Sequence, residues 1–199
     1  MRTSTMETDV RVHPGGWSAD VSGRSQGRTD VGVEVRTPAD EWEWRQASAL
    51  LHDFAEWVRG VAGVDLSAEQ PSFARELDDL EAVYTADDAD MFVAVERGLA
   101  VGIVAARYHR DRSAELKRMY VRRMARGKGI ADRLASEVVN AAASRGCASV
   151  WLETLPGPMD PAIGVYHRCG FVQTRRRGTL DRAGIIVMER SVDGKAGQP

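Results

Sequence analysis

The pattern of apolar and polar residues separates the chain into an unpatterned beginning and a long, regular remainder. Residues 1–32 are rich in Gly, Ser, Thr, Arg and Asp and show no sustained periodicity. Such a segment buries too little apolar area to offset the entropy that ordering costs, so we expect a disordered N-terminal tail. Regular patterning from residue 33 to about residue 192 predicts one folded domain, followed by a flexible tail at 193–199.

Helical spacing is strongest in two segments. The first begins near Thr37, which we expect to be the N-cap, with Pro38 at the first helical position and Asp40 as a capping-box acid. The second begins at Gly129 or Ile130 and repeats apolar residues every four positions until Gly146 stops it. Residues 67–80 and 161–168 predict shorter helices. The apolar face of the first helix comprises Ala47, Leu50, Leu51, Phe54, Trp57 and Val58.

Alternating or continuously apolar short runs predict the strands. They lie at residues 31–37, twice within 91–109 with a turn near Arg97–Gly98, at 114–121, at 148–155, and at 171–177 and 184–190 as a terminal hairpin. Strands interleaved with helices in this order predict an α/β fold: a mixed, largely antiparallel central sheet flanked by helices.

Composition and charge narrow the classes of partner. The chain has 43% hydrophobic and 28% charged residues and a formal net charge of −2, so we expect no general attraction to nucleic acid or anionic membranes. Apolar runs fall short of the roughly 20 residues that span a bilayer. Cys147 and Cys169 match no disulfide or metal pattern, and the four histidines share no ligand spacing, so we expect a cytoplasmic protein without a metal.

A glycine-rich turn, Arg126-Gly127-Lys128-Gly129, directly precedes the strongest helix. Amides at a helix N-terminus bind anions, and glycines let the backbone approach a phosphate closely. A Walker loop is excluded because Gly129 stands where a hydroxyl residue would follow the lysine, and the dinucleotide fingerprint fails because Asp132 occupies its third glycine position. A plain surface turn remains the alternative.

The residues around this turn resemble one family. Arg126-x-x-Gly129-x-Ala131 resembles the Arg/Gln-x-x-Gly-x-Gly/Ala motif of the GNAT superfamily of acetyl-CoA-dependent N-acetyltransferases. The strand ELKRMYV and the downstream LETLPGPMDPAIGVYHRCGF are similar to the family's central strand and C-terminal half, in particular to a subgroup with LDTLPSM…LY…GF. Many members have an asparagine where this chain has Met159, a methionine that the subgroup shares.

This resemblance implies a GNAT-like sheet with splayed central strands and acetyl-CoA as cosubstrate, with no metal. It implies transfer of the acetyl group to a primary amine of a small molecule or peptide, by direct attack on the thioester, in a monomer or homodimer. Residues implied to contact coenzyme A are Met119, Tyr120, Val121, Arg126, Gly127, Lys128, Gly129, Ile130 and Ala131.

The same resemblance implies two catalytic side chains. Glu115 would draw the proton from the amine, and Tyr166 would protonate the departing thiolate, while the backbone N–H of Val121 would stabilise the oxyanion. The alternatives are a strand glutamate that pairs with Lys117 or Arg107, and a tyrosine that only packs under the sheet.

Strand alternation places Glu115, Lys117 and Met119 on one face and the intervening Leu116, Arg118 and Tyr120 on the other. The resemblance also implies that the acceptor lies opposite coenzyme A, between residues 60–80 and 173–184. Acids in the first segment favour a cationic amine; they are Asp65, Glu69, Glu76, Asp78 and Asp79.

Two other functions are alternatives to this interpretation. An acyl-CoA-binding module without turnover is the main alternative, although the presence of both Glu115 and Tyr166 argues against it. A nucleotide-binding switch is disfavoured because the Walker pattern fails.

Overall fold

The computed structural model describes residues 32–175 and 184–192. Apart from Gly32, the expected tails at 1–32 and 193–199 lie outside these residues, as does the middle of the terminal hairpin. The division into a domain with two tails therefore stays a prediction.

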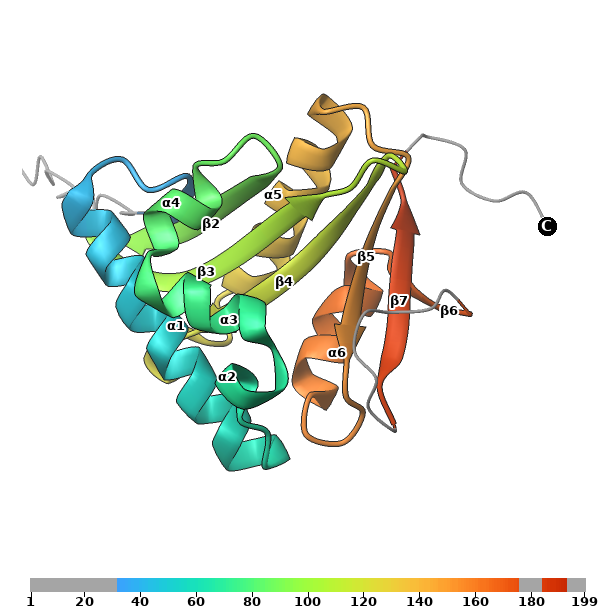
Figure 1. Cartoon of the computed structure of the whole chain (residues 1–199), viewed down its shortest axis with the longest axis horizontal. Coiled ribbons are helices and arrows are strands. Elements are labelled where there is room, and N and C mark those ends of the chain that lie inside the picture. The colour runs from blue at the N-terminus through green and yellow to red at the C-terminus, as the bar shows by residue number, and fades with distance from the viewer. Residues whose placement is uncertain (1–31, 176–183, 193–199) are drawn as a thin grey trace, which may run out of the picture. The chain divides into compact units, whose positions relative to one another are not determined.

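The described residues form a seven-stranded sheet with the order β1-β2-β3-β4-β5-β7-β6 (Figure 1). Every neighbouring pair is antiparallel except β4 and β5, which run parallel. This confirms the mixed, largely antiparallel sheet expected from the sequence. The strands are β1 (Glu34–Arg36), β2 (Ala89–Glu96), β3 (Leu99–Tyr108), β4 (Ser113–Val121), β5 (Ser149–Thr154), β6 (Val172–Thr174) and β7 (Ile186–Ser191).

Helices cover both faces of the sheet (Figure 1). One apolar core lies between the sheet and the first four helices, and a second lies between the sheet and α5 and α6. The helices are α1 (Glu41–Ala62), α2 (Leu66–Glu69), α3 (Pro71–Asp78), α4 (Leu80–Tyr84), α5 (Ile130–Ser144) and α6 (Asp160–Arg168), with a 3₁₀ turn, η1, at Arg123–Ala125.

The predicted start of α1 is wrong by three residues. Asp40, not Thr37, is the N-cap: its extended backbone lets the side chain accept a hydrogen bond from the Glu43 N–H at 2.9 Å. Glu43 in turn accepts from the Ala39 N–H at 2.8 Å and pairs with Arg36 of β1. The two contacts resemble a capping box, except that Glu43 binds the amide before the N-cap and not that of the N-cap itself.

The single helix expected over residues 67–80 is three short helices. Asp65 caps α2 and Asp79 caps α4 through their side chains. Pro71 begins α3, where its missing N–H costs nothing. Two aspartates counted as acceptor-facing acids therefore serve as caps.

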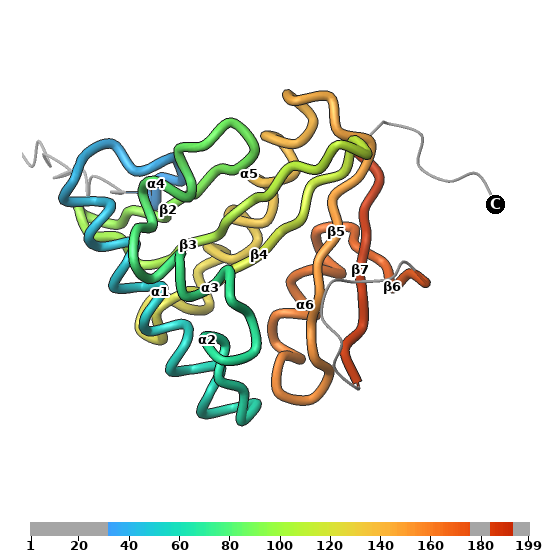
Figure 2. The backbone as a smooth tube through the Cα atoms, viewed as in Figure 1, coloured from blue at the N-terminus to red at the C-terminus, as the bar shows by residue number. Residues whose placement is uncertain are grey.

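The central strands β4 and β5 separate along their length. Their pairing covers only Ser113–Glu115 against Ser149–Trp151, and beyond that point the strands diverge (Figure 2). Side chains from α1, α2 and α6 join those of β4 and β5 around the space between the two strands. The splayed strands implied by the family resemblance are confirmed.

Candidate functional site

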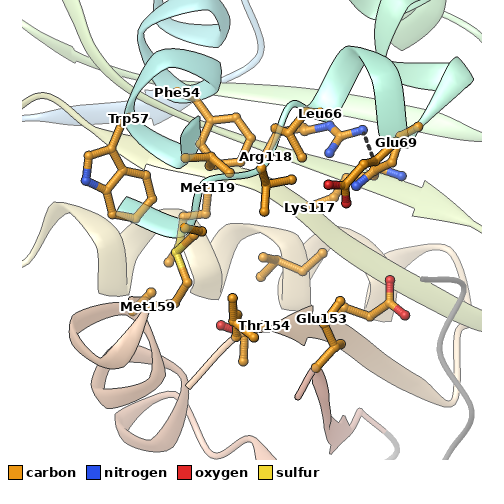
Figure 3. Close-up of a pocket in the computed structure, with 18 of the residues that line it drawn as sticks. Phe54, Trp57, Leu66, Glu69, Lys117, Arg118, Met119, Glu153, Thr154 and Met159 are labelled. Carbon is orange, nitrogen blue, oxygen red and sulfur yellow. Dashed lines mark hydrogen bonds between the residues drawn. The ribbon is translucent and has the colours of Figure 1, made fainter. Parts of the chain in front are cut away.

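Two cavities lie where the central strands separate. The larger, of about 700 Å³, is bounded by α1, α2, β4, β5 and α6 (Figure 3). The smaller, of about 460 Å³, is bounded by the end of β4, the glycine turn, α5 and α6. Trp57, Met119 and Ala162 line both cavities, so the two spaces adjoin.

An extra residue in β4 decides which side chains face the larger cavity. Ile103 pairs with Tyr120 and Ala105 with Lys117, so β4 has three steps where β3 has two. Arg118 takes a φ of 56° at this bulge, a left-handed conformation that is unusual for a residue with a side chain.

The bulge makes the expected alternation of β4 wrong beyond Lys117. Arg118 points to the face covered by α3, the face that also carries Glu115 and Lys117, and it lines the same cavity as they do. Met119 packs against the core under α5 and α6, whereas Tyr120 packs on the α1 side. One inserted residue has exchanged the faces, as a single-residue slip must.

Arg118 holds α3 onto β4 through a buried ion pair. Its Nε lies 2.7 Å from Glu76 Oε2, and its terminal nitrogen lies 3.0 Å from Glu76 Oε1 and 3.0 Å from Gln70 Oε1. The guanidinium also stands 4.5 Å from the centre of the Phe73 ring. Burial acts to lower the Arg118 pKa, but pairing with Glu76 outweighs it and the pKa is raised.

Sequence reasoning missed this pair and treated Glu76 as an acid facing the acceptor. The spacing could have indicated that Glu76 is buried, because Glu76 follows Phe73 by three positions and so shares its buried helix face. Of the acids in residues 60–80, Glu69 does line the larger cavity.

Glu115 is buried in the wall of the larger cavity, at the last paired position before β4 and β5 diverge. Lys117 Nζ lies 3.3 Å from its Oε2, while Arg107 pairs with Asp88. Burial acts to raise the pKa of the Glu115 carboxyl group, but the nearby His109 imidazole and the Lys117 charge outweigh it, and the pKa is lowered. The carboxylate is therefore ionised at neutral pH.

Tyr166 comes from α6 on the other side of the same cavity. Its ring packs edge-on against Phe171, with centroids 6.0 Å apart. Burial raises the pKa of the Tyr166 phenol, so the hydroxyl keeps its proton at neutral pH. The structure thus brings Glu115 and Tyr166 together in one cavity.

Eight of the nine residues expected to contact coenzyme A line the smaller cavity; they are Met119, Tyr120, Val121, Arg126, Gly127, Gly129, Ile130 and Ala131. Gly127 and Gly129 have φ values of 77° and 72°, which glycine adopts without strain, and Gly129 is the N-cap of α5. The amides that begin a 15-residue helix therefore stand at the edge of this cavity.

Two cations of the turn differ in their surroundings. Arg126 Nε donates to the Val121 carbonyl at 2.9 Å, and its guanidinium lies 5.8 Å from the ring centres of both Trp57 and Tyr120. Lys128 does not line the cavity and instead pairs with Glu96, Nζ to Oε1 at 2.7 Å.

His109 is the second residue that sequence reasoning missed. The absence of a shared ligand spacing gave it no role, but it follows β3 directly and its Nε2 is buried, 3.8 Å from Glu115 Oε2. Within residues 32–175 and 184–192, no three His, Cys, Asp or Glu side chains come close enough together to hold a metal ion. None of the helices in those ranges combines the length and apolarity that crossing a bilayer demands.

The sequence of the chain matches the family model described as Acetyltransferase (GNAT) family over residues 44–171, which is more than half of its length. The chain belongs to the GNAT acetyltransferase family. This acetyltransferase is also similar to an N-acetylaspartate synthetase from Danio rerio, with 38% identity over 115 residues. That match covers 57% of this chain and 39% of the fish protein, so the chain spans well under half of that relative's length.

Solved structures share the fold of this acetyltransferase. A GNAT-family acetyltransferase from Staphylococcus aureus Mu50 superposes with a TM-score of 0.65 at 15% identity, covering 81% of this chain and 99% of that one. The PaiA N-acetyltransferase from Thermoplasma acidophilum, solved in complex with coenzyme A, gives 0.64 at 16% identity, with 80% and 99% covered. At these identities the likeness shows the fold, and the family match makes the chain an acyltransferase.

Proposed function

We propose that this enzyme transfers the acetyl group of acetyl-CoA to a primary amine of a small molecule or peptide, by direct attack of the amine on the thioester. One observation carries the proposal. The cavity beside the glycine turn adjoins, through Trp57, Met119 and Ala162, the cavity that holds both Glu115 and Tyr166.

The smaller cavity is suited to the coenzyme. Its glycine turn and the first amides of α5 offer donors and a positive helix end to a pyrophosphate. Arg126 adds a fixed positive charge, because its hydrogen bond to Val121 and the two flanking rings restrict its position. Met119 to Val121, which share this wall, would meet the pantetheine arm, and the Val121 N–H is our candidate oxyanion donor.

The larger cavity would hold the amine and the reacting thioester. The Glu115 carboxylate takes a proton from the ammonium, which frees the nitrogen lone pair to attack the thioester carbonyl carbon. The C–N bond forms, the C–S bond breaks, and the sulfur leaves as a thiolate. Tyr166 gives this thiolate its proton, and the tyrosine recovers one from the nitrogen that has become an amide, so each turnover releases one proton overall.

The charges in the larger cavity and the name of the relative both bear on the identity of the acceptor. The cavity presents Lys117 beside Glu69 and Glu115, so it offers partners for both a carboxylate and an ammonium group. The Danio rerio relative is named for N-acetylaspartate. We therefore place aspartate and other amino acids first among candidate acceptors, ahead of the purely cationic amines that the acids of residues 60–80 had favoured.

A panel of amines tests the proposal through release of free thiol from acetyl-CoA. We expect amine-dependent release with at least one amino acid, peptide or small amine, and little release without an amine. Coenzyme A that binds tightly without turnover of any amine would contradict the proposal and favour a binding module.

A further inference from the structure

His109 lies next to Glu115, at the end of the gap where β4 and β5 are still paired. Its backbone N–H donates to the Ser113 carbonyl at 2.9 Å, which fixes the turn that joins β3 to β4. Its ring lies against Trp151, with centroids 5.7 Å apart and planes inclined by 31°. Trp151 is the register partner of Glu115 on β5, so the imidazole and the carboxylate are held by the same pair of strands.

The two oxygens of Glu115 have different surroundings. Lys117 Nζ and His109 Nε2 both lie against Oε2, at 3.3 Å and 3.8 Å. Oε1 accepts no hydrogen bond from any of the residues that the structure describes. One oxygen is thus left for a substrate proton, while the other faces an imidazole.

Of these two neighbours, only the imidazole can receive a proton. The Lys117 ammonium is a donor with no lone pair, whereas a neutral imidazole has one acceptor nitrogen. His109 Nε2 is buried and has no hydrogen-bond partner in the described part of the chain, which leaves it available to accept. The His109 side chain is also 34% exposed, so a proton on its ring has a route to water.

We propose that His109 relays to solvent the proton that Glu115 takes from the amine. The inference rests on the proposed function and adds a residue to it. The ammonium transfers a proton to Glu115, which becomes a neutral acid. The carboxyl group then turns so that its protonated oxygen faces His109, gives that proton to His109 Nε2 and is a carboxylate again. The resulting imidazolium loses a proton to water. The 3.8 Å separation must shorten during this step, as hydrogen bonds in ligand-free sites commonly do.

The charges around Glu115 favour this transfer. Burial acts to raise the pKa of the Glu115 carboxyl group, but His109, Lys117 and Arg118 stabilise the carboxylate and hold its pKa below the ordinary value, so the protonated acid releases its proton readily. Glu69 from α2 and Glu153 from β5 line the same cavity and add negative charge. His109 acts through Glu115, so it is a positioning and relay residue and not a catalytic one.

Replacing His109 by Gln tests the relay, because glutamine can hydrogen-bond but cannot carry the proton. We expect kcat to fall by about 10²-fold, at the lower end of general acid–base contributions, with KM for acetyl-CoA unchanged. In His109→Ala, added imidazole should restore part of kcat, and stronger azole bases should restore more. The matched control is His52→Gln, an exposed histidine on α1, which should keep the wild-type rate. A His109→Gln enzyme with full kcat, or a slow His109→Ala enzyme that no azole rescues, would overturn the relay.

A second measurement does not depend on turnover. The Glu115 carboxyl group is titrated by ¹³C NMR in the wild type and in His109→Gln. We expect the Glu115 pKa to rise in the variant, since the imidazole is one cause of its lowering. An unchanged pKa would overturn the inference even in an active enzyme. A raised pKa in a protein that acetylates no amine would instead count against the proposed function alone.

Discussion

The buried ion pair between Arg118 and Glu76 allows a quantitative test of how the fold holds the wall of the larger cavity. The two side chains are only 5% and 3% exposed, and Gln70 and Phe73 complete the surroundings of the guanidinium. Replacing Arg118 by Met keeps much of the apolar stem but leaves the Glu76 carboxylate buried without its partner.

Loss of one partner of a buried pair costs about 3–5 kcal/mol, because the remaining charge is desolvated and uncompensated. For a domain of this size each kcal/mol lowers Tm by roughly 2–4 °C, so Arg118→Met should lower Tm by about 6–20 °C. The double variant Arg118→Met/Glu76→Leu removes both charges and should recover most of this loss.

Urea unfolding and thermal melting, both followed by circular dichroism, measure the free energy of unfolding and Tm of both variants against the wild type. Arg45→Met is the matched control: its pair with Glu41 is exposed at 65% and 79%, so its removal should cost about 0.3–0.5 kcal/mol. The reasoning is refuted if Arg118→Met destabilises no more than the control does. It is equally refuted if the double variant is no more stable than Arg118→Met.

Four further predictions concern coenzyme binding and the proposed reaction. Tyr166→Phe should lower kcat by about 10²–10⁴-fold with unchanged affinity for coenzyme A in calorimetry, since only the proton donor is lost; an unchanged kcat would remove the assigned role. Gly129→Glu should abolish coenzyme A binding, because it adds negative charge at the helix N-terminus and a side chain at a φ of 72°. In the same titrations Arg126→Gln should weaken binding more than Lys128→Gln does, and the reverse order would contradict the placement of these cations. Because the Glu115 pKa is lowered from its ordinary 4.5, the Glu115 carboxylate persists as pH falls and is lost only below that value. Equal activity of Glu115→Gln and the wild type at every pH would exclude Glu115 as the base.

The strands and the long helices were predictable because their signals are local. The apolar repeat of α5 and its stop at Gly146 lie within about twenty consecutive residues, and the β2–β3 turn is marked by Arg97–Gly98. The glycine turn was equally predictable, because the amides expected to bind the anion belong to consecutive residues of the turn and of the helix that follows it. Eight of the nine expected coenzyme contacts accordingly line one cavity.

What the sequence could not show depends on contacts between distant residues. Arg118 and Glu76 are 42 positions apart, and each alone resembles an ordinary solvated charge. The bulge turns Arg118 to the α3 face, but no residue in β4 marks its position, so the apolar and polar pattern of the strand does not reveal it. His109 meets Glu115 only because the β3–β4 turn folds back and Trp151 packs on the imidazole ring from another strand.

The most direct test of the central claim follows the acetyl group itself. Isotope-labelled acetyl-CoA is incubated with the protein and the amine that gives thiol release, and mass spectrometry detects the label on the product. The account predicts labelled N-acetylated amine in the same amount as free coenzyme A, and a far lower rate for Glu115→Gln/Tyr166→Phe. Thiol release without labelled amine, or an equal rate in the double variant, would contradict it.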